Sequence, residues 1–189
     1  MTDTITAPNL DELTGTYVLD PAHSRIGFVA RHAMVTKVRG QFREFEGRAH
    51  LDAGDPSESW LELTIQGASI DTGNADRDAH LRSNDFFDLA SHPEIRFVST
   101  AVEAAGPDTY RVTGDLTIKG VTKPVTFDVE YTGTAVDPFG NTRVGLEGSA
   151  RINRNDWGLT WNVPLGKGGV LVSEQVLLEF EVSAIRQSA

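Results

Sequence analysis

The chain has 189 residues, a formal net charge of −10 and no cysteine. Its length fits one domain, and the absence of cysteine excludes disulfides, thiolate catalysis and sulfur-ligated metals. Because an acidic surface repels phosphate backbones and anionic headgroups, we expect no nucleic-acid partner and at most transient contact with a membrane.

Residues 1–14 are polar and lack periodicity, and we predict a flexible leader there, followed by a single domain over residues 15–186. The leader shows neither the basic nor the apolar region of a secretory signal. No stretch reaches the roughly 18 apolar residues of a membrane span. These features predict a cytoplasmic protein.

Near the start of the domain, apolar and polar residues alternate in short runs, which is typical of strands with one buried face. Ile26, Phe28 and His32 share one face of an early run. Over residues 37–52 the alternation changes parity without a turn. This change predicts one long strand with a β-bulge near Arg43-Glu44.

The middle of the chain interrupts the strand pattern. Residues 74–84 carry acidic side chains early and an arginine late, an order that suits the dipole of a short helix. The apolar pair Phe86 and Phe87 follows, and residues 95–100 resume the strand pattern. We therefore expect one or two short helices in an otherwise β-structured chain.

The clearest alternation lies in the second half, where apolar residues occupy one face of several long runs. These runs cover residues 111–119, 125–132, 144–152 and 176–183. Long strands in succession predict an antiparallel sheet that closes on itself. The predicted fold is all-β, an eight-stranded antiparallel β-barrel with one or two short helices.

The alternation leaves open what fills the barrel, because eight strands can enclose either their own side chains or one small ligand. Gly40, Gly114 and Gly148 fall on the inward faces. They favour a cavity, because a glycine leaves a gap unless something fills it; the alternative is that they relieve strain at the corners of the barrel. We expect Trp157 and Trp161 to close one end of the barrel.

A group of polar residues in the first half of the chain has three interpretations. Its members are His23, Ser24, His32, Arg77, Asp78 and His80. They could hold a divalent metal ion, satisfy backbone groups where the helix packs across a barrel end, or bond the polar end of a ligand. The histidine spacing matches no metal motif, and we predict neither a metal site nor a catalytic residue.

Seven blocks of the sequence, in order, resemble the YceI-like family over about residues 15–186. They are Tyr17-x-Leu19-Asp20-Pro21-x-His23-Ser24-x-Ile26-x-Phe28, Gly40-x-Phe42-x-x-Phe45-x-Gly47, Ser69-Ile70-x-Thr72, Arg77-Asp78-x-His80-Leu81-Arg82-Ser83-x-Asp85-Phe86-Phe87-Asp88, His92-Pro93-x-Ile95-x-Phe97, Gly114-x-Leu116-Thr117-Ile118-Lys119-Gly120-Val121-Thr122 and Asn153-Arg154-x-Asp156-Trp157-Gly158-Leu159. The resemblance implies a lipocalin-like barrel with an elongated apolar cavity that binds a long isoprenoid or similar amphiphile. It is also compatible with a homodimer.

We therefore expect a carrier or sequestering protein for a polyprenyl chain, quinone or fatty amide, with no cofactor other than this lipid. The residues predicted to contact the lipid are Ile26, Phe28, His32, Phe42, Ile65, His80, Phe86, Phe97, Leu116, Ile118, Phe127, Val129, Leu146, Trp157, Trp161, Leu178 and Phe180. Two alternatives stay open: an enzyme that acts on such a lipid with His and Asp groups at the cavity mouth, and a structural or stress-response module whose cavity is incidental.

Overall fold

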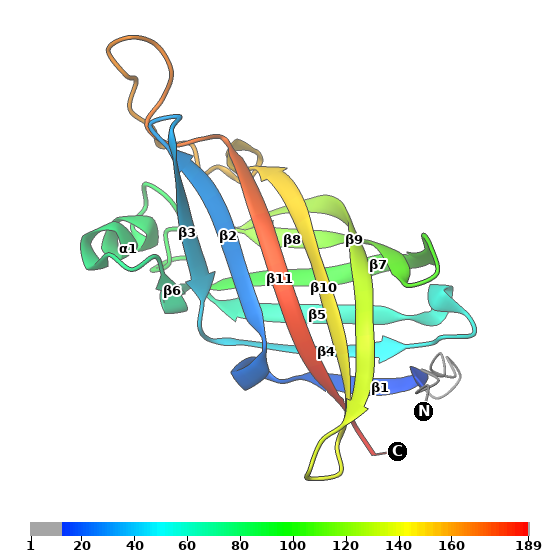
Figure 1. Ribbon diagram of the computed structural model, residues 1–189. Coiled ribbons are helices and arrows are strands. Elements are labelled where there is room, and N and C mark those ends of the chain that lie inside the picture. Colours follow the sequence, from blue (N-terminus) through cyan, green and yellow to red (C-terminus); the bar gives the residue numbers. More distant parts are fainter. Residues whose placement is uncertain (1–12, 189) are drawn as a thin grey trace, which may run out of the picture.

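The computed structural model describes residues 13–188, and its regular secondary structure is mainly β-sheet (Figure 1). The strands are β1 (Gly15–Leu19), β2 (Arg25–His32), β3 (Thr36–Phe42), β4 (Phe45–Leu51), β5 (Trp60–Gln66), β6 (Ile70–Asp71), β7 (Glu94–Ala104), β8 (Thr109–Ile118), β9 (Val121–Val136), β10 (Thr142–Asn153) and β11 (Gln175–Arg186). The helices are α1 (Ala75–Arg82) and the short 3₁₀ turns η2 (Pro21–His23), η3 (Pro56–Glu58), η4 (Gly67–Ser69) and η5 (Arg154–Trp157). Within residues 13–188, no helix is long and apolar enough to cross a membrane.

These segments form a closed antiparallel barrel of eight strands, as the sequence predicts. Three barrel strands are each broken in two: β1 continues as β2, β3 as β4, and β5 as β6. β1 and β2 both pair with β11, and β3 and β4 pair with β6 and β5. The pairing of β1 with β11 closes the barrel, so the sheet encloses an interior.

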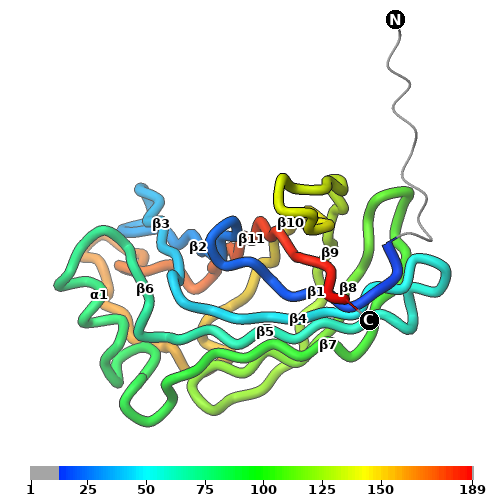
Figure 2. The backbone as a smooth tube through the Cα atoms, turned by 90° about the horizontal axis from the view of Figure 1, so that it is seen from below, coloured from blue at the N-terminus to red at the C-terminus, as the bar shows by residue number. Residues whose placement is uncertain are grey.

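The interior lies between two layers of strands that cross each other steeply. β4, β5 and β7 run across one wall, while β2, β10 and β11 run diagonally over the other (Figure 1). Seen from below, the strands form two layers, and α1 and β6 lie together at one end (Figure 2). Figure 1 also shows the segment between β10 and β11 projecting beyond the β2–β3 turn.

The predicted change of parity is present, but as a break between two strands: β3 ends at Phe42 and β4 begins at Phe45. Shifts of register occur instead at Ser99–Ala101 and Gly145–Leu146. Both phenylalanines are buried, although strict alternation would send residues three apart to opposite faces. The two residues between them leave the ladder: the Arg43 amide donates to the Ser69 carbonyl, and the Glu44 carbonyl accepts from the Gln66 amide. The break therefore lets the strand present apolar side chains inward along its whole length.

Short-range signals explain the turns and the helix. Asn74 caps α1 by accepting a hydrogen bond from the Arg77 amide at 2.9 Å, and Asp76 and Asp78 occupy the first turn, where the helix dipole favours negative charge. Lys119 and Gly120 join β8 to β9 with φ of 51° and 75°. Left-handed angles at both positions match the twist of the flanking strands.

The predicted leader falls mostly outside the described residues, which begin at position 13. Leu13 is buried, and its carbonyl accepts a hydrogen bond of 3.0 Å from the hydroxyl of the fully buried Tyr17. The Thr14 hydroxyl accepts from the Ala53 amide at 3.1 Å. The last two residues of the predicted leader therefore pack against the barrel.

Candidate functional site

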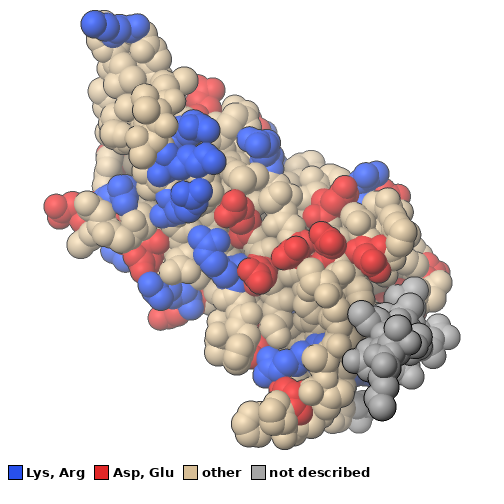
Figure 3. All heavy atoms as spheres, in the orientation of Figure 1, with Lys and Arg blue, Asp and Glu red and all other residues tan. Residues whose placement is uncertain are grey.

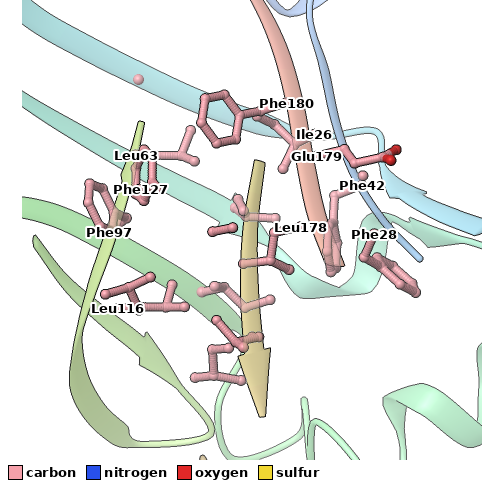
Figure 4. Close-up of a pocket in the computed structure, with 18 of the residues that line it drawn as sticks. Ile26, Phe28, Phe42, Leu63, Phe97, Leu116, Phe127, Leu178, Glu179 and Phe180 are labelled. Atoms are coloured by element: carbon pink, nitrogen blue, oxygen red, sulfur yellow. The ribbon is translucent and has the colours of Figure 1, made fainter. Parts of the chain in front are cut away.

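The barrel encloses a cavity of about 290 Å³ whose wall is almost wholly hydrocarbon (Figure 4). This volume is near the lower end of the ~300–1,000 Å³ typical of small-molecule sites. The wall runs lengthwise: on β11 alone it extends from Val176 to Ala184. Eight residue steps at about 3.3 Å correspond to roughly 26 Å of strand. A long, narrow, apolar space suits a slim hydrocarbon chain.

All but three of the predicted site residues line this cavity. Those in the wall are Ile26, Phe28, Phe42, Ile65, Phe86, Phe97, Leu116, Ile118, Phe127, Val129, Leu146, Trp157, Leu178 and Phe180. His32, His80 and Trp161 are not in the wall. His32 is exposed at the end of β2, and the other two pack against each other outside it. Contact between the wall residues and a ligand stays a prediction.

The interpretation of the inward glycines is wrong, because neighbouring phenylalanine rings fill their gaps. A Cβ built on Gly40 would lie 2.3 Å from Cζ of Phe28, its partner across the β2–β3 ladder. Gly148 stands in the same relation to Phe180, with a separation of 2.7 Å. Phe97 covers Gly114 diagonally at 2.3 Å. The absence of a side chain at these glycines therefore lets the phenylalanine rings pack against the backbone.

The position of these rings over the glycines still favours a cavity, for a different reason. A ring whose tip rests over the next strand lies along the barrel wall and does not project across the lumen. The rings of Phe97 and Phe180 each pack against Phe127, with centroids 5.4 and 5.2 Å apart and tilted planes. Such geometry is favourable for aromatic pairs. Figure 4 shows these rings along one side of the space.

Sequence reasoning missed several wall residues that share the alternation. Leu61 and Leu63 are on the parity of Ile65, and Val125 is on the parity of Phe127. The alternation of apolar and polar residues in these strands therefore indicated that they face the interior. Other wall residues come from short or irregular segments, where no stripe exists; these are Leu81, Phe87, Leu159 and Val172.

Trp157 and Arg154 form the wall near the projecting segment. Trp157 is buried, lines the cavity and donates from Nε1 to the Leu116 carbonyl at 2.9 Å. Trp161 packs outside the wall, on the rings of His80 and Phe86. Of the two tryptophans, only Trp157 lines the cavity, and closure of one end of the barrel stays a prediction.

Arg154 is a buried cation whose side chain bonds backbone carbonyls. Nε donates to Ser173 at 2.9 Å and Nη2 to Val172 at 3.2 Å. Nη1 donates to Trp161 at 3.0 Å and also to Leu159. Burial lowers the pKa of its guanidinium, and the charge of Glu174 opposes that change. Arg154 thus ties the segment between β10 and β11 to the barrel.

The polar residues around α1 form hydrogen bonds that hold the helix in place. Asp78 is buried and accepts from the Thr72 amide at 3.0 Å and from the Thr72 hydroxyl. Arg77 donates to the hydroxyl and to the carbonyl of the same threonine, both at 2.7 Å. These bonds fasten the helix to the end of β6 and satisfy backbone groups there, as one of the three interpretations predicts.

The three histidines do not converge. His23 bonds Asp20 through Nδ1 at 2.7 Å, while His32 bridges to Val172. His80 bonds Asp85 through Nε2 at 2.8 Å. Among residues 13–188, no group of three or more histidine, aspartate or glutamate side chains is arranged to hold a metal ion.

The closed antiparallel barrel with an apolar interior defines the lipocalin-like class of fold. Within it, the chain belongs to the YceI-like domain family, whose model matches residues 17–184. A UPF0312 protein of Azotobacter vinelandii is 36% identical over 173 residues, covering 90% of this chain and 87% of that protein.

Solved structures share the fold. Burkholderia cenocepacia BcnA superposes with a TM-score of 0.76 at 27% identity, over 87% of this chain and 98% of the other. A polyisoprenoid binding domain from Saccharophagus degradans gives 0.66 at 18% identity, over 90% and 98% of the two chains.

Proposed function

We propose that this protein binds one long-chain isoprenoid or similar amphiphilic lipid inside the barrel and acts as its carrier or sequestering protein. The observation that carries the proposal is the lengthwise apolar cavity. The fold shared with the polyisoprenoid binding domain supports it, as does membership of the YceI-like family. Polyprenyl chains, prenylated quinones and fatty amides all match the chemistry of the wall.

The energetics favour reversible exchange with a membrane. Each methylene that leaves water for an apolar site gains about 0.8 kcal/mol. A lipid that leaves a bilayer for the cavity moves between two apolar media, so the net change per methylene is close to zero. Cavity length and shape then decide which lipid is held, and loading and release need no large energy input.

Binding without chemistry is the simpler role for this cavity. An enzyme needs a titratable pair that opens onto the lumen. Among the described residues, the histidine–aspartate pairs are His80–Asp85 and His23–Asp20, and none of these residues belongs to the cavity wall. We therefore propose a non-catalytic role for the protein. In this role the His80–Asp85 pair only links α1 to the segment that follows it.

Native mass spectrometry of the purified protein, followed by organic extraction, tests the proposal. We expect a discrete mass excess that extracts as a prenyl chain, a quinone or a fatty amide. If the protein is empty, titration with a polyprenol, a prenylated quinone and a fatty amide should show saturable uptake by one of them. A folded protein that takes up none of the three would overturn the proposal.

A matched pair of variants tests whether uptake uses the lumen. Ala150 lines the cavity, and its neighbour Ser149 is exposed on the outer face. Ala150→Phe should fill part of the lumen and weaken uptake at least tenfold, whereas Ser149→Phe should leave uptake unchanged. Circular dichroism checks that both variants fold. Equal uptake by both would place the lipid elsewhere.

A further inference from the structure

The end of the barrel with the projecting segment carries a basic, partly apolar surface that the acidic chain as a whole does not suggest. We define this "basic tip" as residues 31–39 and 162–173. These two segments contain Arg31, Lys37, Arg39 and Lys167 and no aspartate or glutamate. They are joined by a hydrogen bond of 2.7 Å from the Ala33 amide to the Leu171 carbonyl and by the His32–Val172 bridge.

Among the described residues, the cations of the basic tip form no ion pair, whereas five arginines elsewhere on the barrel do. Arg25, Arg43, Arg48, Arg111 and Arg143 all form ion pairs with carboxylates. Over residues 13–188, no carboxylate lies within ion-pair distance of any of the four tip cations. Arg31 and Lys37 also face each other across the β2–β3 ladder. Like charges in that position destabilise a sheet, so stability does not explain them.

Exposed apolar side chains protrude beside these cations. Met34 and Val35, in the β2–β3 turn, are 58% and 77% exposed, and Val163 in the second segment is 41% exposed. Ala33 and Met34 have φ of 50° and 65°. Two left-handed residues without glycine are unfavourable, and burial of the turn does not compensate for it. Backbone strain of this kind points to a function.

Charge is segregated along the barrel, which orients this end toward a negative partner. Figure 3 shows lysine and arginine gathered over β2, β3 and the projecting segment, with aspartate and glutamate across the middle of the same face. The exposed Glu174 directly follows the second segment and borders the tip, but within residues 13–188 it forms no ion pair with a tip cation. Glu179 and Glu181 are more distant, because they pair with Gly27 and Arg25, four and six residues before Arg31. They therefore lie about 13 and 20 Å away along the sheet. Physiological salt screens charges beyond about 8 Å, so the tip cations act locally.

We propose that the basic tip is the surface with which this protein docks transiently on an anionic lipid bilayer. Exposed apolar residues beside lysine and arginine are the features that insert into an interface and attract anionic headgroups. The cavity wall reaches the base of the tip at Ala30 and Val172. This proposal rests on the proposed lipid-binding function, because docking there would bring the cavity to the source of its ligand.

Co-sedimentation with vesicles tests the docking surface. We expect binding to vesicles of phosphatidylcholine mixed with phosphatidylglycerol, much weaker binding to phosphatidylcholine alone, and loss of binding at high salt. Lys37→Glu should weaken the binding about fivefold or more, because each basic residue near an anionic surface contributes about that factor. Arg96→Glu is the matched control: Arg96 is exposed on β7 and lacks an ion pair among the described residues.

A second pair of variants tests the apolar part. Val35→Asp should weaken vesicle binding, whereas Phe139→Asp should not, although Phe139 is 89% exposed in the β9–β10 turn. Uptake of a polyprenol from detergent should be the same in all four variants. Equal effects of Lys37→Glu and Arg96→Glu, or no vesicle binding by the wild type, would overturn the docking surface. If the wild type takes up no polyprenol from detergent, that result would instead overturn the proposed function.

Discussion

The two ends of the barrel differ in whether their basic side chains form ion pairs with carboxylates. At the β9–β10 turn, Arg143 donates to Asp137 at 2.8 Å and to Asp20 at 2.7 Å, and all three side chains are mostly buried. At the basic tip, the cations are exposed and have no carboxylate partner within residues 13–188. The contrast indicates that the first end is arranged for stability and that the second keeps its charge available to a partner.

The largest effect should come from the wall between the two ends. Phe127→Asp places an unpaired charge beside Phe97 and Phe180 in the apolar lumen, which costs several kcal/mol. We expect either failure to fold or loss of lipid uptake. Thr126→Asp is the matched control, because Thr126 is exposed and bonds Thr113 on the outer face. Urea denaturation and polyprenol uptake measure both; two silent variants would contradict the assigned facing.

That facing could be predicted from sequence because strand alternation is local. The alternation predicted the strands, the change of facing after Phe42 and most of the cavity wall. The seating of Phe28 on Gly40 could not be predicted, because it depends on the register between strands, which a one-residue slip would reverse. The role of Arg154 was also hidden, because its partners are carbonyls of an irregular segment that has no sequence signature.

The next largest effect should follow the removal of Arg154, which holds the basic tip in place. Arg154→Met leaves the carbonyls of Leu159, Trp161 and Ser173 without their side-chain donor, and we expect a loss of about 3–5 kcal/mol in the free energy of unfolding. Arg154→Lys retains the charge but loses the fork of donors, so it should also destabilise. Urea denaturation gives the size of the loss.

Limited proteolysis shows whether that loss is local to the tip. In Arg154→Met, cleavage should begin within residues 160–174, while the β9–β10 turn stays protected. Cleavage at both ends together would mean that the barrel opens as one unit and that the two ends are not independent.

The pH dependence of stability should distinguish the β9–β10 end. Hydrogen bonds from Arg143 hold the pKa of Asp137 well below its usual range, and they also lower the pKa of Asp20. Because the folded-state values are depressed, these groups stabilise the fold above the ordinary carboxyl pKa of about 4, and this contribution is lost as pH falls through the folded-state values.

Asp137→Asn tests this assignment. The variant should be less stable than the wild type at neutral pH, and the difference should shrink progressively as the pH falls below about 4. Thermal unfolding at a series of pH values measures it. Asp128→Asn is a suitable control, because Asp128 pairs with Arg111 at an exposed site and should contribute little at any pH. A constant difference between Asp137→Asn and wild type would rule out the proposed role of the carboxylate charge.

The smallest effect, at the basic tip, has an unusual sign. Lys37→Glu places a carboxylate opposite Arg31, where the wild type has two cations face to face. An opposite-charge pair in that position contributes roughly 0.2–1 kcal/mol, so the variant should be slightly more stable while it binds anionic vesicles less well. Natural selection for stability alone would not retain lysine there. Urea denaturation of Lys37→Glu beside Arg96→Glu measures the difference; a destabilised Lys37→Glu would mean that the lysine serves the fold, and the contrast between the two ends would then lose its functional meaning.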